Sequence, residues 1–230
     1  MNNKTVLSVI PARSGSKRLP RKNMLPLCGK PLISWTIEAS LASSYIDRTV
    51  VSTDDSEIVK LNEDKKVEII NRPAELATDE SPTFPVVEHA LSQIGDVFGY
   101  VALLQPTSPL RNQHHIDEAF ERLIKKKADA VISICESDHS PLWSNILPED
   151  GNLNNFLNAD VKGIRSQDLP KYFRVNGAIF IIKVNKLLEE KSFYLKSSIY
   201  SYIMSKQHSV DIDDRFDFIL AESIMNSIRN

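Results

Sequence analysis

Short apolar runs alternate with helical patterns along the first 136 residues. Five runs rich in β-branched and aliphatic residues are typical of strands, at residues 5–10, 48–53, 67–70, 100–104 and 130–135. Between them, helices are predicted at residues 32–43, 54–62 and 82–93, and a fourth helix follows from the apolar spacing of Ile116, Ala119, Phe120, Leu123 and Ile124. Strands that alternate with helices predict an α/β fold, with a mostly parallel sheet flanked by helices.

The pattern changes after residue 137. Residues 138–176 are rich in Asp, Asn, Ser and Pro and show no clear helix, and this stretch is too long for a simple loop. Strand patterns return at residues 178–183 and 198–204, and a helical apolar stripe occupies residues 216–228. We therefore expect a core formed by residues 1–137 and 177–230, with residues 138–176 inserted as a separate lobe.

Composition narrows the classes of function. The 230 residues include 42% hydrophobic and 25% charged side chains and carry a formal net charge of -2, as is ordinary for a soluble globular protein. The slightly acidic balance disfavours binding to nucleic acid. No apolar run is long enough to span a membrane, the first residues lack a signal-peptide pattern, and Cys28 and Cys135 imply no disulfide framework. We expect a cytoplasmic enzyme or binding protein.

A cluster of cationic side chains directly follows the first predicted strand. This basic loop, residues 11–23, reads PARSGSKRLPRKN and holds five Arg or Lys residues. Ligands of open α/β sheets bind beyond the carboxyl ends of strands, and a glycine there lets backbone N–H groups approach a phosphate. Arg13, Lys17 and Lys22 can neutralise a triphosphate. The loop matches neither a Walker A motif nor GxGxxG, and a solvated basic loop is the alternative.

Two aspartates stand close together near the end of the chain. Asp211 and Asp213 are separated by one residue, so in a strand their carboxylates would face the same way. Mg²⁺ prefers oxygen ligands and is usually held by one or two carboxylates plus substrate phosphates. The alternative is that Asp213 or Asp214 only caps the last helix.

Two further segments carry polar side chains that suit a sugar acid. The turn at residues 103–111, LLQPTSPLR, is fixed by two prolines and is expected to expose Gln105 and Arg111 beyond the fourth strand. A glutamine there can both donate to and accept from hydroxyl groups. In the irregular lobe, Arg165 and Arg174 lie near aromatic residues, and arginines suit a substrate carboxylate. The alternatives are a rigid connector for the first segment and a solvated surface arm for the second.

These four segments, in this order, resemble the CMP-sialic acid synthetases (acylneuraminate cytidylyltransferases), including enzymes for related acids such as legionaminic acid. The resemblance also covers VSTDD at 51–55, RPAELATD at 72–79, NGAIFI at 176–181 and SVDID at 209–213, so it extends over nearly the whole chain. It implies a Rossmann-like nucleotidyltransferase fold and a homodimer whose lobe reaches the partner's active site. It also implies transfer of CMP from CTP to the anomeric hydroxyl of a nine-carbon 2-keto sugar acid, with release of pyrophosphate.

The same resemblance implies roles for the matching residues. The nucleotide-binding residues would be Arg13, Ser16, Lys17, Lys22, Asn23, Arg72, Ser81 and Thr83. The sugar-binding residues would be Gln105, Arg165, Arg174 and Asn176, with Arg165 acting in the neighbouring subunit. Mg²⁺ or another divalent cation would be held by Asp211 and Asp213. The residues that act in catalysis would be Arg13, Lys22, Arg165, Asp211 and Asp213.

Three departures from the family pattern leave the particular nonulosonic acid open. Ser166 stands where many members have a second arginine, Trp143 where some bacterial sialic acid enzymes have a basic residue, and Arg18 where glycine is common. One alternative is a cytidylyltransferase for the eight-carbon acid KDO, whose family lacks the segment at residues 105–111. The other is a non-catalytic, regulatory nucleotide-binding module, which the intact aspartate pair disfavours.

Overall fold

The computed structural model describes residues 5–62, 67–157 and 161–229. Within this part of the chain, seven strands form one sheet in the order β5-β4-β1-β6-β8-β7-β9. β8 runs antiparallel to its neighbours β6 and β7, and the other adjacent pairs are parallel, so the expected mostly parallel sheet is confirmed. The strands are β1 Val6–Pro11, β4 Arg48–Thr53, β5 Glu68–Asn71, β6 Tyr100–Leu103, β7 Ala130–Glu136, β8 Phe173–Lys183 and β9 Ile199–Ile203.

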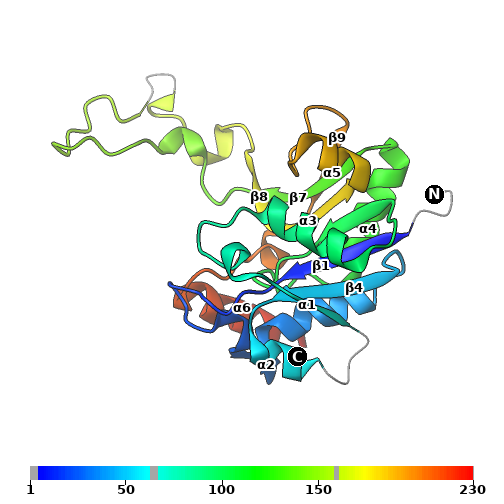
Figure 1. Ribbon diagram of the computed structural model, residues 1–230. Coiled ribbons are helices and arrows are strands. Elements are labelled where there is room, and N and C mark those ends of the chain that lie inside the picture. The colour runs from blue at the N-terminus through cyan, green and yellow to red at the C-terminus, as the bar shows by residue number, and fades with distance from the viewer. Residues whose placement is uncertain (1–4, 63–66, 158–160, 230) are drawn as a thin grey trace.

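Helices cover both faces of the sheet (Figure 1). Alternation along β1 directs Val6 and Ile10 into a core with α1, α2 and α4, and directs Leu7 and Val9 into a core with α3 and α5. Each fully buried aliphatic side chain stabilises the fold by about 1.5–3 kcal/mol. The helices are α1 Leu32–Leu41, α2 Ser56–Leu61, α3 Thr83–Ile94, α4 Gln113–Lys126, α5 Val184–Glu190 and α6 Arg215–Arg229.

A third apolar cluster ties the basic loop to the end of the chain. Leu19 of the loop and Ile212, which stands between the two aspartates, pack together beneath α6. A short hairpin, β2 Pro26–Leu27 and β3 Lys30–Pro31, closes the same cluster. Trp35 packs against this cluster and donates from Nε1 to the Leu27 carbonyl at 3.1 Å. The cluster holds segments about 190 residues apart in sequence side by side.

Three details of the fold differ from the sequence expectations. β8 begins at Phe173 rather than at residue 178. The sequence did not indicate this start, because the first three residues of the strand are exposed and lack a core pattern; they nevertheless pair with the end of β7. The seven-residue helix α5 was not expected at all. The strand expected around Asp211 and Asp213 is not formed; this segment is an irregular connection, fixed by a hydrogen bond from the Ile212 N–H to the Thr107 carbonyl at 2.8 Å.

The predicted lobe is an arm that projects away from the sheet (Figure 1). Its described residues include short 3-10 turns at Pro141–Trp143 and Ser166–Asp168. Ile146, Leu147 and Leu153 on the arm are 88%, 66% and 57% exposed, so among the described residues no core covers these apolar side chains. Residues 158–160 of the lobe, and residues 1–4 of the segment that lacks a signal-peptide pattern, lie outside the described part. Among the described helices, none has the length and apolar character that crossing a bilayer requires.

Candidate active site

The parallel strands β1, β4, β5 and β6 end at one edge of the sheet, and a cleft of about 240 Å³ opens there. Because the chain leaves each of these strands at the same edge, segments far apart in sequence meet there and line this cleft, which we call the first cleft. It is lined by eight residues that the sequence predicts to bind ligand: Arg13, Ser16, Lys22, Asn23, Arg72, Ser81, Thr83 and Gln105.

The basic loop is held in a fixed shape above the first cleft. The Ser14 N–H and Oγ donate to the Asp54 carboxylate at 2.8 and 2.7 Å, and the Asn23 side chain donates to the Arg13 carbonyl at 3.1 Å. Asp79, across the cleft, pairs with Arg13 Nη1 at 2.5 Å and with Lys17 Nζ at 2.8 Å. The Lys17 and Arg13 side chains hold the pKa of the Asp79 carboxyl below its usual range. The Asp79 carboxylate thus lies where the loop cations would bind a phosphate.

Arg72 forms part of the cleft wall from the end of β5. Its guanidinium donates to the Ser52 carbonyl at 2.5 Å and to the Ser52 hydroxyl at 3.1 Å, so it lies against the end of β4. Burial lowers the pKa of Arg72 to about 10, and the group is still charged at neutral pH. Ser81, whose hydroxyl donates to the Glu75 carbonyl at 3.0 Å, and Thr83, the first residue of α3, complete this side.

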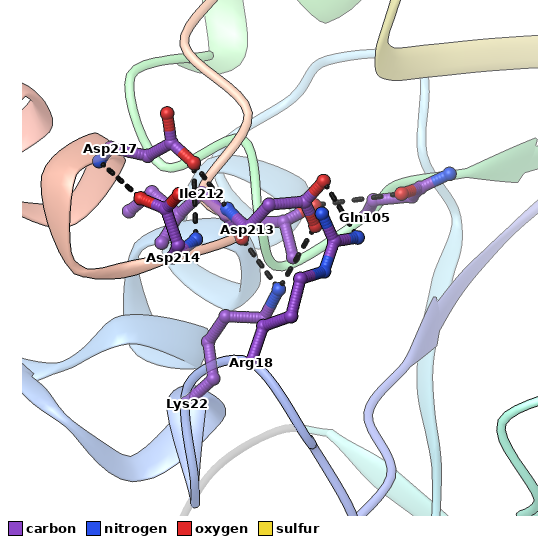
Figure 2. Close-up of polar contacts among 8 residues, drawn as sticks. Arg18, Lys22, Gln105, Ile212, Asp213, Asp214 and Asp217 are labelled. Atoms are coloured by element: carbon purple, nitrogen blue, oxygen red, sulfur yellow. Dashed lines mark hydrogen bonds and ion pairs between the residues drawn. The ribbon is translucent and has the colours of Figure 1, made fainter. Parts of the chain in front are cut away.

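Lys22 connects the basic loop to the aspartate pair (Figure 2). Its ammonium donates to the Ile212 carbonyl at 2.5 Å and lies 3.5 Å from Asp213 Oδ1, while Arg18 Nη2 lies 3.0 Å from Asp213 Oδ2. Asp214, not Asp213, caps α6, since its carboxylate accepts from the N–H groups of residues 216 and 217 at 2.8 and 3.1 Å. The capping alternative therefore applies to Asp214 and leaves the Asp213 carboxylate facing the two cations.

Asp211 stands in a different environment from Asp213. It is half-buried, and its Oδ1 atom is buried without a hydrogen-bond partner among the described residues. Burial raises the pKa of the Asp211 carboxyl, and the charge of Asp213 raises it further. A Cβ atom placed on Gly177 would lie 3.5 Å from Asp211 Oδ2 and 3.7 Å from Gln105 Oε1. Asp211 and Gln105 therefore flank the same point of β8.

A second cleft of about 540 Å³ adjoins the aspartates. Asp211, Asp213 and Arg174 line it together with Lys206 and the apolar residue Leu220. Lys22 lines the first cleft and reaches Asp213 in the second, so the two clefts meet at this lysine.

Three predicted site residues do not line either cleft. Lys17 is mostly exposed and reaches the first cleft only through its ion pair with Asp79. Arg165 is exposed on the arm, where its Nε pairs with Asp168 at 2.8 Å. Asn176 is buried within β8, where its amide bonds to Ser133 Oγ at 2.6 Å and to Ser209 Oγ at 2.9 Å.

One sequence expectation about the 103–111 turn is wrong. Gln105 does face the first cleft, but Arg111 is only 1% exposed rather than presented at the strand end. Two residues of the site were missed from sequence, Asp79 and Gly177. The acidic residue that ends the RPAELATD segment could have suggested a partner for the loop cations, whereas the position of Gly177 depends on the pairing of β8.

Residues 7–225 match the Cytidylyltransferase family, and the chain belongs to that family. It is 41% identical over 215 residues to an N-acylneuraminate cytidylyltransferase of Streptococcus agalactiae, covering 93% of this chain and 51% of that protein. It is 38% identical over 231 residues to the CMP-N,N'-diacetyllegionaminic acid synthase of Legionella pneumophila, covering 96% of each. The chain thus spans about half the length of the N-acylneuraminate relatives and nearly all of the legionaminic acid relative.

A solved structure supports the fold. CMP:2-keto-3-deoxy-manno-octonic acid synthetase, solved in complex with CTP, superposes with a TM-score of 0.72 at 16% identity, covering 97% of this chain and 99% of that one. At this identity the likeness shows the fold alone, and it confirms the expected Rossmann-like nucleotidyltransferase architecture.

Proposed function

We propose that this protein transfers CMP from CTP to the anomeric hydroxyl of a nine-carbon 2-keto sugar acid and releases pyrophosphate. One observation carries the proposal: the basic loop, Arg72 and Gln105 line a single cleft, and Lys22 links that cleft to Asp211 and Asp213. The names of the relatives support CTP as donor and a nonulosonic acid as acceptor. Because CTP is made inside cells, the proposal keeps the cytoplasmic location expected from the sequence.

The nucleotide is proposed to enter the first cleft with its triphosphate on the basic loop. Arg13, Lys17 and Lys22 would take up phosphate charge, which displaces Asp79 from its two cations. Ser16 and Asn23 also line this cleft and would contact the phosphates and the ribose. Arg72, with Ser81 and Thr83, would read the cytidine end, and all three residues line the same cleft.

The acceptor is proposed to lie between Gln105 and the aspartates. Its anomeric oxygen attacks the α-phosphorus and passes its proton to a carboxylate of the Asp211 and Asp213 pair or to water, while the bond from that phosphorus to the pyrophosphate oxygen breaks. Positioning and charge neutralisation account for most catalysis of this kind. Gln105 can bond to sugar hydroxyls, and Arg174, in the second cleft, suits the acid's carboxylate. Asn176 is proposed to support this region from behind, because its amide already bonds to protein groups.

The aspartate pair fits a divalent cation. The unpartnered buried Oδ1 of Asp211 and the neighbouring carboxylate of Asp213 supply the oxygen donors that Mg²⁺ prefers. No third His, Cys, Asp or Glu side chain of the described residues joins the pair in a metal-binding cluster. Substrate phosphates would therefore supply the remaining oxygen ligands. When bound, such an ion would neutralise phosphate charge at the reacting centre.

We also propose that two copies of the chain form a homodimer in which the arm reaches the partner's active site. Arg165 lies outside the clefts of its own chain, and the arm carries exposed apolar residues that a second copy would cover. Arg165 would then meet the acceptor in the neighbouring subunit. Size-exclusion chromatography with light scattering tests the assembly, and a monomer at micromolar concentration would contradict it.

A pyrophosphate-release assay tests the proposed function. CTP and Mg²⁺ are supplied with N-acetylneuraminic, legionaminic, pseudaminic or KDO acid in turn, and release is expected with at least one nine-carbon acid. Release with KDO alone would favour the eight-carbon alternative, and CTP binding without any release would favour a regulatory module. Asp211→Ala should abolish turnover in a folded protein, whereas Asp96→Ala, an exposed carboxylate paired with Arg48, should not.

A further inference from the structure

Arg111 carries a charge that the proposed reaction does not use. Among the described residues it is the largest side chain that is fully buried. No carboxylate of the described residues pairs with it, and its Nε and Nη1 atoms have no hydrogen-bond partner there. Burial lowers its pKa to about 9, so the guanidinium remains protonated at neutral pH.

Keeping such a charge in the interior is unfavourable. Buried charges are normally paired, and apolar residues of similar volume often serve stability equally well or better. The preceding residue, Leu110, packs in an apolar cluster with Leu27 and Leu32, and a methionine at 111 would have a volume close to that of the arginine. Stability therefore does not explain the arginine at this position, and a role in the site would explain it.

The contacts of Arg111 lead to one backbone atom. Its Nη2 donates to Thr36 Oγ1 at 2.9 Å and lies 3.5 Å from the Gln105 carbonyl oxygen. The Thr36 hydroxyl donates to that same oxygen at 3.4 Å, and the Ser108 N–H donates to it at 3.3 Å. Three donors thus converge on the Gln105 carbonyl, one from α1 and two from the turn itself.

The other side of the same turn faces the substrates. The Gln105 side chain lines the first cleft and lies beside Gly177, opposite Asp211. The Thr107 carbonyl accepts from the Ile212 N–H at 2.8 Å, which ties the turn to the segment that bears both aspartates. A small movement of this turn would therefore displace Gln105 at the first cleft.

We propose that Arg111 is a positioning residue that fixes the Gln105 carbonyl, and through it aims the Gln105 side chain at the sugar acid. The inference rests on the proposed function, because it assigns the acceptor to Gln105. A planar guanidinium presents donors in a rigid fork that lysine cannot reproduce. The effect is specific to the acceptor, since the basic loop and Arg72 hold the nucleotide through other segments.

The test compares Arg111→Met and Arg111→Lys with the parent enzyme in the pyrophosphate-release assay, varying each substrate separately. KM for the sugar acid should rise on the order of 10- to 100-fold in both variants, the usual effect of a misplaced binding group. KM for CTP should stay within about twofold, and urea unfolding of Arg111→Met should show equal or greater stability. Arg48→Met, at the remote start of β4, is the matched control and should leave both KM values unchanged.

Each outcome decides the matter. A parent that releases no pyrophosphate with any acid overturns the proposed function and this inference with it. An active parent with an unchanged acid KM in Arg111→Met overturns the inference alone, as does an equal rise in both KM values that accompanies lost stability. If Arg111→Met fails to fold, Thr36→Val must raise the acid KM while Thr36→Ser, which keeps the hydroxyl, must not; equal behaviour of these two also overturns it.

Discussion

Replacing Asn176 with alanine should destabilise the fold rather than remove a direct contact with the sugar. Asn176 is 1% exposed, and its Oδ1 accepts from Ser133 Oγ at 2.6 Å and from the Ala178 N–H at 3.2 Å. Its Nδ2 donates to Ser209 Oγ at 2.9 Å and to Met204 Sδ at 3.3 Å. The side chain therefore joins β7 and β8 to the segment that leads to Asp211.

The loss of unfolding free energy depends on which hydrogen bonds the partners of Asn176 keep in the variant. The Ser133 hydroxyl can still donate to the Ile179 carbonyl at 3.2 Å, and Ser209 Oγ still donates to the Ser205 carbonyl at 2.7 Å. The Ala178 N–H loses its Asn176 acceptor inside the protein. A buried group left unsatisfied costs about 1–3 kcal/mol and each lost neutral hydrogen bond about 0.5–1.5 kcal/mol, which together give about 2–4 kcal/mol.

Urea unfolding followed by circular dichroism measures this change. Asn152→Ala, an exposed asparagine on the arm, is the control and should shift the unfolding free energy by less than about 0.5 kcal/mol. The reasoning is refuted if Asn176→Ala is as stable as the control but has a raised KM for the acid. That result would mean that the asparagine contacts the sugar directly.

Three other changes test separate parts of the structure. Asp79→Asn should lower the Kd of CTP in calorimetry without metal, because the carboxylate competes with phosphate for Arg13 and Lys17; a higher Kd would mean that Asp79 itself binds the nucleotide. Gly177→Ala should cost about 1–2 kcal/mol in urea unfolding, because φ is 75° at this position, and a neutral result would contradict the described backbone. Burial holds the pKa of His115 near 4, below the unfolded value of about 6.5, so stability present above that pH is lost as pH falls. Between pH 7 and pH 5 the parent should therefore lose more stability than His115→Gln; parallel curves would contradict it.

Local patterns were enough to predict most of the sheet and one wall of the site. Alternation in β1 and the helical spacing around Phe120 specify which face each side chain buries, and the buried residues follow that pattern. The rule that ligands bind beyond strand ends then places the basic loop, Arg72 and Gln105 at one edge, although they come from different strands. Both inferences need only the local sequence and the direction of the chain.

The remaining features depend on contacts between distant segments. Arg111 would be expected at the surface from its residue type, and only the packing of α1 against the 103–111 turn buries it. The different surroundings of Asp211 and Asp213 arise because Lys22, about 190 residues earlier, lies beside one of them. Periodicity does not encode such pairings, and a pair of aspartates in a sequence looks equivalent until the chain is folded.

The fold also changes the expected charge of the basic loop. From sequence, its five cations suggest a strong positive potential, but in the fold each has a carboxylate partner. Asp79 serves Arg13 and Lys17, Asp213 serves Arg18 and Lys22, and Glu57 serves Arg21. Binding of a triphosphate then exchanges one set of anions for another, so the affinity for CTP should depend on ionic strength less steeply than five unpaired cations would predict.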